Sequence, residues 1–151
     1  MQAAIIKRAA RIDRRGRSAD SGIPKLNGRR SDEAEAGAAR VLINCAGIGI
    51  GARIVGRDGP HPLDQFSRTI EINLIGTFNL MRLAAADMQK LEPLAEGERG
   101  CSGPTAACAA FEGQIGQAAY SASKGGIVAV TLGAAREFAP VAIIGLTKRS
   151  V

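Results

Sequence analysis

Residues 63–90 repeat apolar side chains at the spacing of an α-helix, and this segment limits the possible folds more than any other. The repeat passes through seven apolar positions: Phe66, Ile70, Leu74, Phe78, Met81, Ala85 and Met88. Side chains at this spacing line one face of a helix, which is then buried against a neighbouring layer. Asp64 in the first turn and Lys90 in the last suit the helix dipole. The sequence therefore predicts one long amphipathic helix.

Two short apolar runs and a second helical stretch accompany this helix. Residues 41–45 read as a buried strand, and so do residues 141–146. A helical stretch from about 115 to 138 precedes the second run, and Pro140 ends it because proline cannot continue a helix. Strand, helix, helix and strand at these lengths predict an α/β layered fold with a parallel sheet.

Residues 100–111 lie where this order of elements calls for one more strand. Gly103 and Pro104 stand at the centre of the interval. Proline has no N–H to donate to a neighbouring strand, so it is found mainly at sheet edges and bulges. The sequence therefore disfavours a central strand here.

The composition fits one globular domain and excludes several classes of protein. Hydrophobic residues make up 46% of the 151 residues and charged ones 23%. No apolar run approaches the roughly 20 residues of a membrane span. The three cysteines, Cys45, Cys101 and Cys108, have no metal-ligand spacing and are too few for a disulfide framework. We therefore expect no metal site, no membrane partner and a reducing, cytoplasmic location.

Residues 1–40 differ in character from the rest of the chain. They hold ten Lys or Arg and five Asp or Glu, so they carry +5 of the net charge of +6. They show no sustained period of 2 or 3.6 and predict a basic, disordered arm. An organellar presequence and a nucleic-acid-binding arm are the alternatives. Neither has the regularity that its mechanism needs, and we expect no nucleic-acid partner.

Glycines alternate in the loop after the first strand. The run Gly47-x-Gly49-x-x-Ala52 fits the G-x-G-x-x-G/A signature of a pyrophosphate-binding turn. That signature needs a helix directly after it, whose N-terminus faces the phosphates. The following residues instead include Gly56, Gly59, Pro60 and Pro62, which a helix interior does not accept. The sequence therefore predicts that this loop is not the pyrophosphate turn.

Tyr120 and Lys124 are candidates for acid–base chemistry. They lie four residues apart on a predicted helix and so share a face. A lysine ammonium close to a phenol stabilises the phenolate, which lets the tyrosine act as a base toward an alcohol or an acid toward a ketone. An exposed tyrosine beside an exposed lysine is the structural alternative. The position within "AAYSASKGG" favours the catalytic interpretation.

Three motifs occur along the chain in a set order: Asn44-Cys45-Ala46-Gly47 after the first strand, Asn73 in the long helix, and Tyr120-x-x-x-Lys124 in the next helix. Together they resemble the signatures of the short-chain dehydrogenase/reductase family. The segments "NLIGTFNLMRL" and "AAFEGQIGQAAYSASKGG" are similar to one branch of it, the type-2 3-hydroxyacyl-CoA dehydrogenases and the related type-10 17β-hydroxysteroid dehydrogenases. The resemblance covers residues 41–147.

The resemblance implies a partial Rossmann-like, doubly wound parallel sheet over residues 41–151. It implies NAD-dependent oxidation of a secondary alcohol, such as a 3-hydroxyacyl-CoA or a hydroxysteroid, with Tyr120 as the acid–base group. Asn73 would hold a water molecule in the proton relay. The residues implied to bind the cofactor are Asn44, Ala46, Gly47 and Lys124. A small-molecule substrate and a homo-oligomer are also implied.

The chain departs from the family pattern in three places. Residues 1–40 contain no strand followed by T-G-x-x-x-G-x-G, the family's pyrophosphate turn, and the residue that selects NAD or NADP is absent with it. Ala107 stands at the position of the family's catalytic serine, whose hydroxyl donates to the substrate oxygen. The similarity fades after Thr147. We therefore expect a truncated, partly scrambled member with little or no activity.

Two hypotheses follow from these departures. Residues 100–111 keep the family's length but not its residue types, so we hypothesise that this interval and residues 1–40 are read out of frame from a damaged gene. An uninterrupted frame on resequencing would contradict that. The alternative function is an inactive fragment that pairs with a full-length relative, or with itself, through the helices carrying Asn73 and Tyr120.

Overall fold

The computed structural model describes residues 39–145 and, for the backbone alone, residues 148–150. The arm predicted over residues 1–40 lies outside the described residues except for its last two. The elements follow the chain in this order: β1 (Val41–Asn44), β2 (Val55–Gly56), β3 (Gly59–Pro60), α2 (Leu63–Ile70), the π-helix η1 (Glu71–Ile75), α3 (Gly76–Met88), β4 (Gly100–Ala107), the 3₁₀ turn η2 (Cys108–Ala110), α4 (Ala118–Phe138), the 3₁₀ turn η3 (Ala139–Val141), β5 (Ile143–Gly145) and β6 (Lys148–Ser150).

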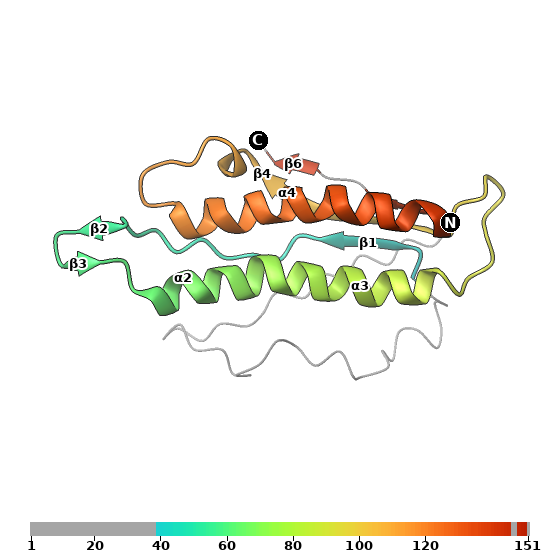
Figure 1. Cartoon of the computed structure of the whole chain (residues 1–151), viewed down its shortest axis with the longest axis horizontal. Helices are drawn as coiled ribbons and strands as arrows, with labels where there is room; N and C mark the ends of the chain where they lie inside the picture. Colours follow the sequence, from blue (N-terminus) through green and yellow to red (C-terminus); the bar gives the residue numbers. More distant parts are fainter. Residues whose placement is uncertain (1–38, 146–147, 151) are drawn as a thin grey trace.

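The main sheet is parallel, with strand order β1-β4-β5, and β6 pairs with the far end of β4 (Figure 1). Val41 lies opposite Cys101, and Cys101 lies opposite Ile144. The two predicted terminal strands are therefore both confirmed, although the second begins at Ile143, after a left-handed residue at Ala142. The prediction of an α/β fold with a parallel sheet is confirmed.

The prediction that residues 100–111 do not form a central strand is wrong. β4 runs through Gly103 and Pro104 and is bordered by β1 on one side and by β5 and β6 on the other. Cys101 donates its N–H to the Arg40 carbonyl on the β1 side. Because backbone groups alternate between the two neighbours of a parallel strand, the nitrogen of Pro104 faces the opposite side. On that side, β5 pairs with β4 as far as Ser102, and β6 pairs with β4 from Thr105 onward. The N–H that Pro104 lacks therefore falls between the two partner strands.

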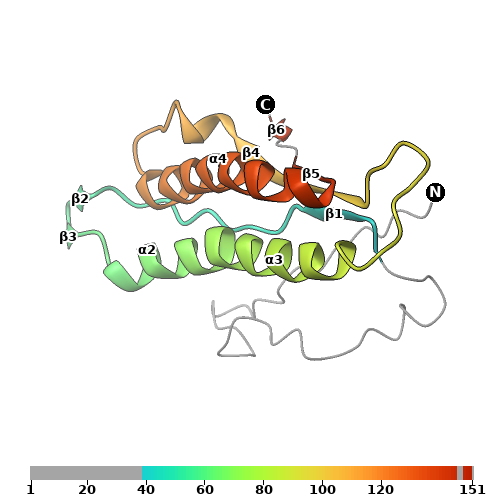
Figure 2. The same cartoon turned by 45° about the vertical axis from the view of Figure 1, so that its right-hand side comes forward.

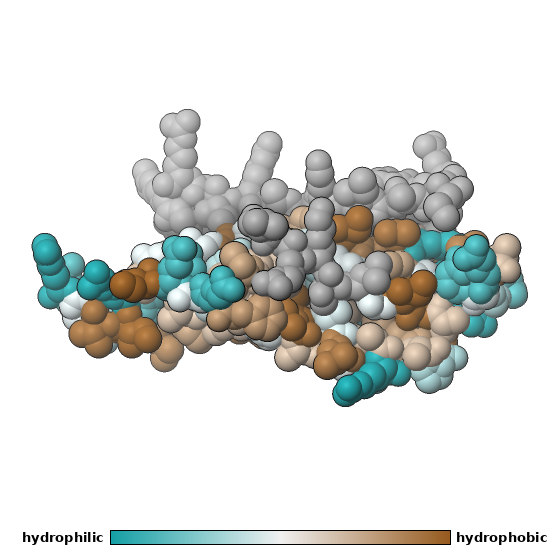
Figure 3. All heavy atoms as spheres, turned by 90° about the horizontal axis from the view of Figure 1, so that it is seen from above, coloured by the Kyte–Doolittle hydropathy of each residue, from teal (hydrophilic) through white to brown (hydrophobic). Residues whose placement is uncertain are grey.

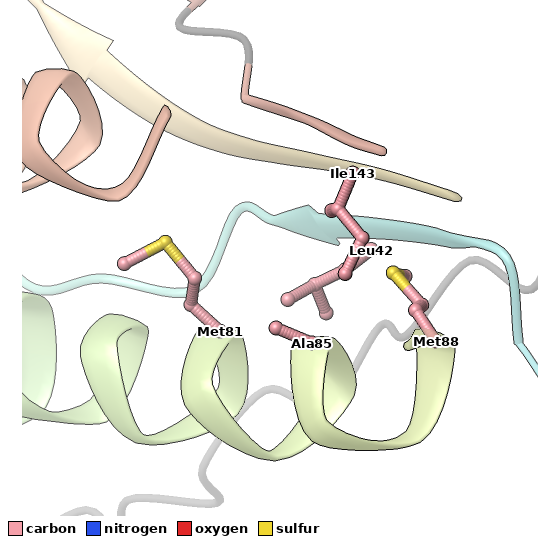
Figure 4. Packing of buried hydrophobic residues seen from close by; sticks show 5 residues of the cluster. All are labelled: Leu42, Met81, Ala85, Met88 and Ile143. Carbon is pink, nitrogen blue, oxygen red and sulfur yellow. The ribbon is translucent and has the colours of Figure 1, made fainter. Parts of the chain in front are cut away.

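Both long helical segments pack on one face of the sheet. α4 and the continuous α2–η1–α3 segment run side by side in both views (Figures 1 and 2). The centre of the core consists of Leu42 from β1, Ile143 from β5, and Met81, Ala85 and Met88 from α3 (Figure 4). Half-buried residues of α4 cover this cluster from the other helix: Val130, Ala134 and Phe138. Burial of these apolar side chains is the main term that stabilises the layers.

The predicted helix over residues 63–90 is confirmed as one helical segment from Leu63 to Met88, but its buried stripe differs from the prediction. Phe78 is 49% exposed, whereas the predicted pattern placed it on the buried face. From Thr69 to Thr77 the buried positions are the polar residues Thr69, Asn73 and Thr77. This face packs against α4 and the loop after β1, where Asn73 makes hydrogen bonds to Ile48 and Ser123.

Two glycines let the helices approach their neighbours closely. A Cβ at Gly126 of α4 would lie 2.6 Å from Leu74 Cδ2, so the helices touch here through the glycine backbone. A Cβ at Gly100 of β4 would lie 2.6 Å from Met88 Sδ. A Cβ at Gly100 would also lie 2.8 Å from the Arg40 carbonyl oxygen, so this position needs glycine for packing, whereas at Gly126 the Leu74 side chain would have to move.

Ser102 is a polar residue inside the apolar layer, because it is 2% exposed and its Oγ has no hydrogen-bond partner. We expect Ser102→Ala to raise the free energy of unfolding by about 1 kcal/mol, since it removes an unsatisfied buried hydroxyl. Denaturant titration followed by circular dichroism measures this. Ser123→Ala is the matched control: Ser123 is equally buried, but its hydroxyl accepts from Asn73 and donates to the Tyr120 carbonyl. That variant should lose stability, and an equal loss in both variants would contradict the interpretation of Ser102.

Candidate active site

Tyr120 and Lys124 lie in the first two turns of α4 and line one pocket of about 510 Å³. The structure thus brings together the two residues that the sequence predicts for acid–base chemistry. The glycine loop after β1 forms the opposite wall. The complete lining is Cys45, Gly47, Ile48, Gly49, Ile50, Gly51, Thr105, Gln117, Tyr120 and Lys124.

Lys124 is buried, and its charged end is held at the carboxyl end of the sheet. Its Nζ donates a hydrogen bond of 2.8 Å to the Thr105 carbonyl at the end of β4. The same Nζ lies 5.6 Å from the centre of the Tyr120 ring. Burial lowers the pKa of the Lys124 ammonium, and the Coulombic contribution of Cys45 opposes this shift. The pocket therefore holds the Lys124 amino group beside the Tyr120 ring. The backbone of β4 sets the position of this amino group.

Asn73 lies on η1 and is fully buried. Its Oδ1 accepts from the Ile48 N–H at 2.8 Å, and its Nδ2 donates to the Ile48 carbonyl at 2.8 Å. The same Nδ2 also donates to Ser123 Oγ at 3.0 Å, and Ser123 Oγ donates to the Tyr120 carbonyl at 2.7 Å. One amide thus joins the helix, the glycine loop and the turn of α4 that carries Tyr120. π-Helical turns are rare and occur often at functional sites.

The loop after β1 passes close to Asn73 at Gly47 and close to Tyr120 at Gly49. A Cβ at Gly47 would lie 3.1 Å from Asn73 Oδ1, and a Cβ at Gly49 would lie 3.6 Å from Cδ2 of the Tyr120 ring. The Gly47 contact is tighter than a side chain accepts without movement of Asn73. Gly47 therefore serves close packing of the loop against Asn73, whereas a side chain at Gly49 would make an ordinary contact with the Tyr120 ring.

The remaining predicted cofactor residues divide into two groups. Gly47 and Lys124 line the pocket, whereas Asn44 and Ala46 do not. Asn44 is buried at the end of β1, and its Nδ2 donates to the Thr77 carbonyl of α3 at 3.4 Å. Its contact braces the strand against the helix, while the Ala46 side chain is exposed.

Of Thr105 and Ala107 on β4, only Thr105 brings a hydroxyl group to the pocket. Ala107, at the position of the expected serine, is buried and contributes no donor. Thr105, two residues earlier on β4, lines the pocket, and its Oγ1 lies 3.5 Å from Cys45 Sγ. Thr105 and Ser123 are residues of the site that the sequence motifs do not predict. Alternate residues of a strand face the same side, so a strand over residues 100–107 would have placed Thr105 on the same side as Gly103. That signal was usable only if the strand itself had been predicted.

A dinucleotide fits only part of this site. The wall formed by Tyr120 and Lys124 has the donors suited to a ribose. For the pyrophosphate, the loop after β1 leads into the β2–β3 hairpin and not into a helix N-terminus. Within residues 39–145, no strand is followed directly by a glycine turn and a helix. The geometry thus agrees with the prediction that the Gly47–Ala52 run is not the phosphate turn.

The described part of the chain offers neither a metal-binding cluster nor a membrane-spanning helix. No cluster of three or more His, Cys, Asp or Glu side chains there is placed to hold a metal ion. No helix among these residues combines the length and the apolar character that crossing a bilayer requires.

Comparison with known proteins identifies similar sequences over most of the chain. A family model described as short chain dehydrogenase matches residues 30–146. The 3-hydroxyacyl-CoA dehydrogenases type-2 of Bos taurus and Homo sapiens are 51% and 50% identical to it over 109 residues. Those alignments cover 71% of this chain but 42% of each relative. The chain therefore spans about two fifths of the length of the curated relatives that it matches.

Solved structures give the same result for the fold. A 3-hydroxyacyl-CoA dehydrogenase type-2 from Mycobacterium avium superposes with a TM-score of 0.69 at 39% identity, covering 77% of this chain and 46% of that chain. An NAD+-bound xylitol dehydrogenase gives a TM-score of 0.66 at 31% identity, covering 78% and 42%. The described sheet and helices thus correspond to part of a larger Rossmann-like domain.

Asn73→Ala tests whether this one amide holds the site together. The change leaves both backbone groups of Ile48 without their partner and removes the hydrogen bond that the Ser123 hydroxyl accepts, so we expect a loss of roughly 2–4 kcal/mol in the free energy of unfolding. The Ile48 amide should also exchange with solvent faster in hydrogen-exchange NMR. Asn79→Ala is the control, since among the described residues the Asn79 side chain hydrogen-bonds only to Arg82, within the same helix. Unchanged protection of Ile48 in Asn73→Ala would contradict the assignment.

Proposed function

Since the chain belongs to the short-chain dehydrogenase family, we propose that its pocket is the acid–base part of a site for oxidising secondary alcohols, such as 3-hydroxyacyl thioesters. The observation that carries the proposal is the placement of Tyr120 and Lys124 on one wall of a pocket whose other wall is fixed by Asn73. The name shared by the similar relatives, 3-hydroxyacyl-CoA dehydrogenase type-2, supports the substrate class. The cofactor type is proposed as NAD.

In this proposal the protein moves one proton and orients the reacting alcohol. Tyr120 accepts the hydroxyl proton of the alcohol, or gives it back to the ketone in the reverse direction. Lys124 stabilises the phenolate by its charge, and its hydrogen bond to the Thr105 carbonyl keeps it beside the ring. Asn73 acts by positioning, because it fixes Ile48 and, through Ser123, the turn that carries Tyr120. A nicotinamide, when bound, supplies the hydride acceptor.

Two features of this site lead us to expect a low rate of alcohol oxidation by this chain. Ala107 has no hydroxyl to donate to the substrate oxygen, where a preorganised donor contributes most in the transition state. The described residues also lack a phosphate-binding turn, so they offer a dinucleotide only its ribose side. We therefore propose an impaired oxidoreductase site and not a fully active one.

Ala107→Ser tests the role of the missing donor. With NAD+ and a 3-hydroxyacyl thioester, we expect NADH formation, followed by absorbance, to rise by about 100-fold over the unmodified chain. The double variant Ala107→Ser/Tyr120→Phe should lose this gain and fall to or below the rate of the unmodified chain, since the acid–base group is then absent. NADH alone should give no saturable fluorescence change with the unmodified chain. Tight, stoichiometric NADH binding would contradict the proposal that the cofactor site is incomplete.

A second candidate function is association with another chain of this family. Several large apolar side chains on the helical layer are exposed: Ile75 at 40%, Phe78 at 49% and Leu132 at 58%. Exposed apolar side chains on a helical surface mark an interaction site where they form a patch. The observation favours pairing through the outer faces of η1, α3 and α4.

Leu132→Lys should disrupt such pairing, because it places a charge within an apolar contact. We expect the unmodified chain to sediment as a defined dimer and the variant as a monomer in analytical ultracentrifugation. Val55→Lys is the matched control, since Val55 is equally apolar, is 71% exposed and lies on the β2–β3 hairpin away from the helices. A polydisperse aggregate in place of a dimer, or equal dissociation of both variants, would argue against this function.

A further inference from the structure

One side of the main sheet carries no layer of helices within the described residues. The helices that contact its strands, α3 and α4, lie on the other side, where they cover Leu42 and Ile143. A parallel sheet is ordinarily covered on both faces. The side without helices is therefore where a further segment is expected to pack.

The side chains on this side form one apolar row across three strands. Val41 of β1 lies opposite Cys101 of β4, and Cys101 lies opposite Ile144 of β5. Ile43 points to the same side, because alternate residues of a strand do so. Ile43 is 36% exposed and Ile144 is 48% exposed, whereas their apolar neighbours on the helical side are almost fully buried. These four residues are called the open face below.

An acidic loop borders the open face at the end where the strands begin. Residues 91–98, between α3 and β4, hold Glu92, Glu96 and Glu98 and no Lys or Arg. Within residues 39–145 none of these three carboxylates makes an ion pair. Figure 3 shows hydrophilic residues gathered at the end of the molecule that carries this loop. The loop therefore offers free negative charge beside an apolar surface.

Arg40 joins the start of β1 to the acidic loop. Its Nη2 donates to the Glu92 carbonyl at 3.0 Å, and its Nη1 donates to the Arg99 carbonyl at 3.1 Å. The Arg40 carbonyl accepts from the Cys101 N–H at 2.8 Å. The chain thus reaches β1 at the corner where the acidic loop meets the open face.

One stretch outside the described residues has the two properties that match this corner. Residues 5–17 include Ile5, Ile6 and Ile12, and they carry six Lys or Arg and a single Asp. Residues 18–38 join this stretch to the described chain and span up to roughly 70 Å when extended. Three neighbouring strands span only roughly 10 Å. The linker is therefore long enough to bring residues 5–17 back over the sheet.

We propose that residues 5–17 of the same chain cover the open face, with their isoleucines against Val41, Cys101 and Ile144 and their basic side chains beside the acidic loop. The apolar contact removes surface from water, and the opposite charges set the direction in which the stretch lies. A linked segment also has a higher effective concentration than a separate partner. The inference does not depend on the proposed function, because no residue of the open face lines the pocket that contains Tyr120.

The rate of alkylation of Cys101 measures whether the open face is covered. The full chain is used with Cys45→Ser and Cys108→Ser, because both of these thiols are exposed. The probe is iodoacetamide, which is uncharged, and the product is followed by mass spectrometry. We expect Ile6→Asp to raise the rate by about 10-fold, since a carboxylate loses its hydration against an apolar row. Ile23→Asp is the matched control, an isoleucine of the same arm outside the stretch, and should leave the rate unchanged.

The charges are tested with the same probe. The double variant Glu92→Gln/Glu96→Gln should also raise the rate of Cys101 alkylation, by a smaller factor, and should reduce its dependence on salt. Glu112→Gln is the control, because Glu112 is an exposed glutamate outside the acidic loop. Its rate and its salt dependence should match those of the chain with all its glutamates.

Proximity is tested by a disulfide, in the same background without Cys45 and Cys108. With oxidised glutathione as the oxidant, Ile6→Cys should form an intramolecular disulfide with Cys101, and Ile23→Cys should not. Absence of that disulfide, together with equal alkylation rates in Ile6→Asp and the unmodified arm, would overturn the proposal. So would an Ile23→Asp rate as high as that of Ile6→Asp. Protection of Cys101 that disappears on dilution would also overturn it, because a second copy would then cover the open face.

Discussion

The buried amide of Asn73 is the interaction on which the rest of the site depends. It makes three hydrogen bonds from a side chain with no exposed surface. A glycine-rich loop has high conformational freedom, and both bonds to Ile48 fix this loop at one point against a rigid helix. Through Ser123 the same amide also fixes the turn of α4 that carries Tyr120. A buried amide is costly to leave unpaired, so this network rigidifies the pocket only when it is complete.

The sheet supplies the second constraint, because it places the charge of Lys124. β4 ends at Ala107, and the Thr105 carbonyl near its end accepts a hydrogen bond from the Lys124 ammonium. A charge with so little exposure is stable only with such a partner. The pocket therefore lies where the strands of a parallel sheet end, as ligand sites of open α/β sheets generally do.

Much of the fold was predictable because it rests on local patterns. The helical spacing in residues 63–90 and the apolar runs around Leu42 and Ile143 each correspond to an observed element. β4 was not predicted, because the rule against proline in central strands does not account for a change of partner strand at Pro104. Phe78 was placed wrongly for a related reason: the buried face of the helix turns toward polar contacts around Asn73, which no hydropathy pattern encodes.

The sequence by itself determined the types and order of the elements and the presence of Tyr120 and Lys124 four residues apart on one helix. These features depend on interactions between residues near in the chain, which side-chain periodicity records. Only the tertiary structure decided that Gly47 serves the close approach of the loop to Asn73, that Asn73 joins the loop to Ser123, and that the Thr105 carbonyl holds Lys124. Each of these contacts joins segments far apart in the sequence, so it exists only after the sheet and helices have packed.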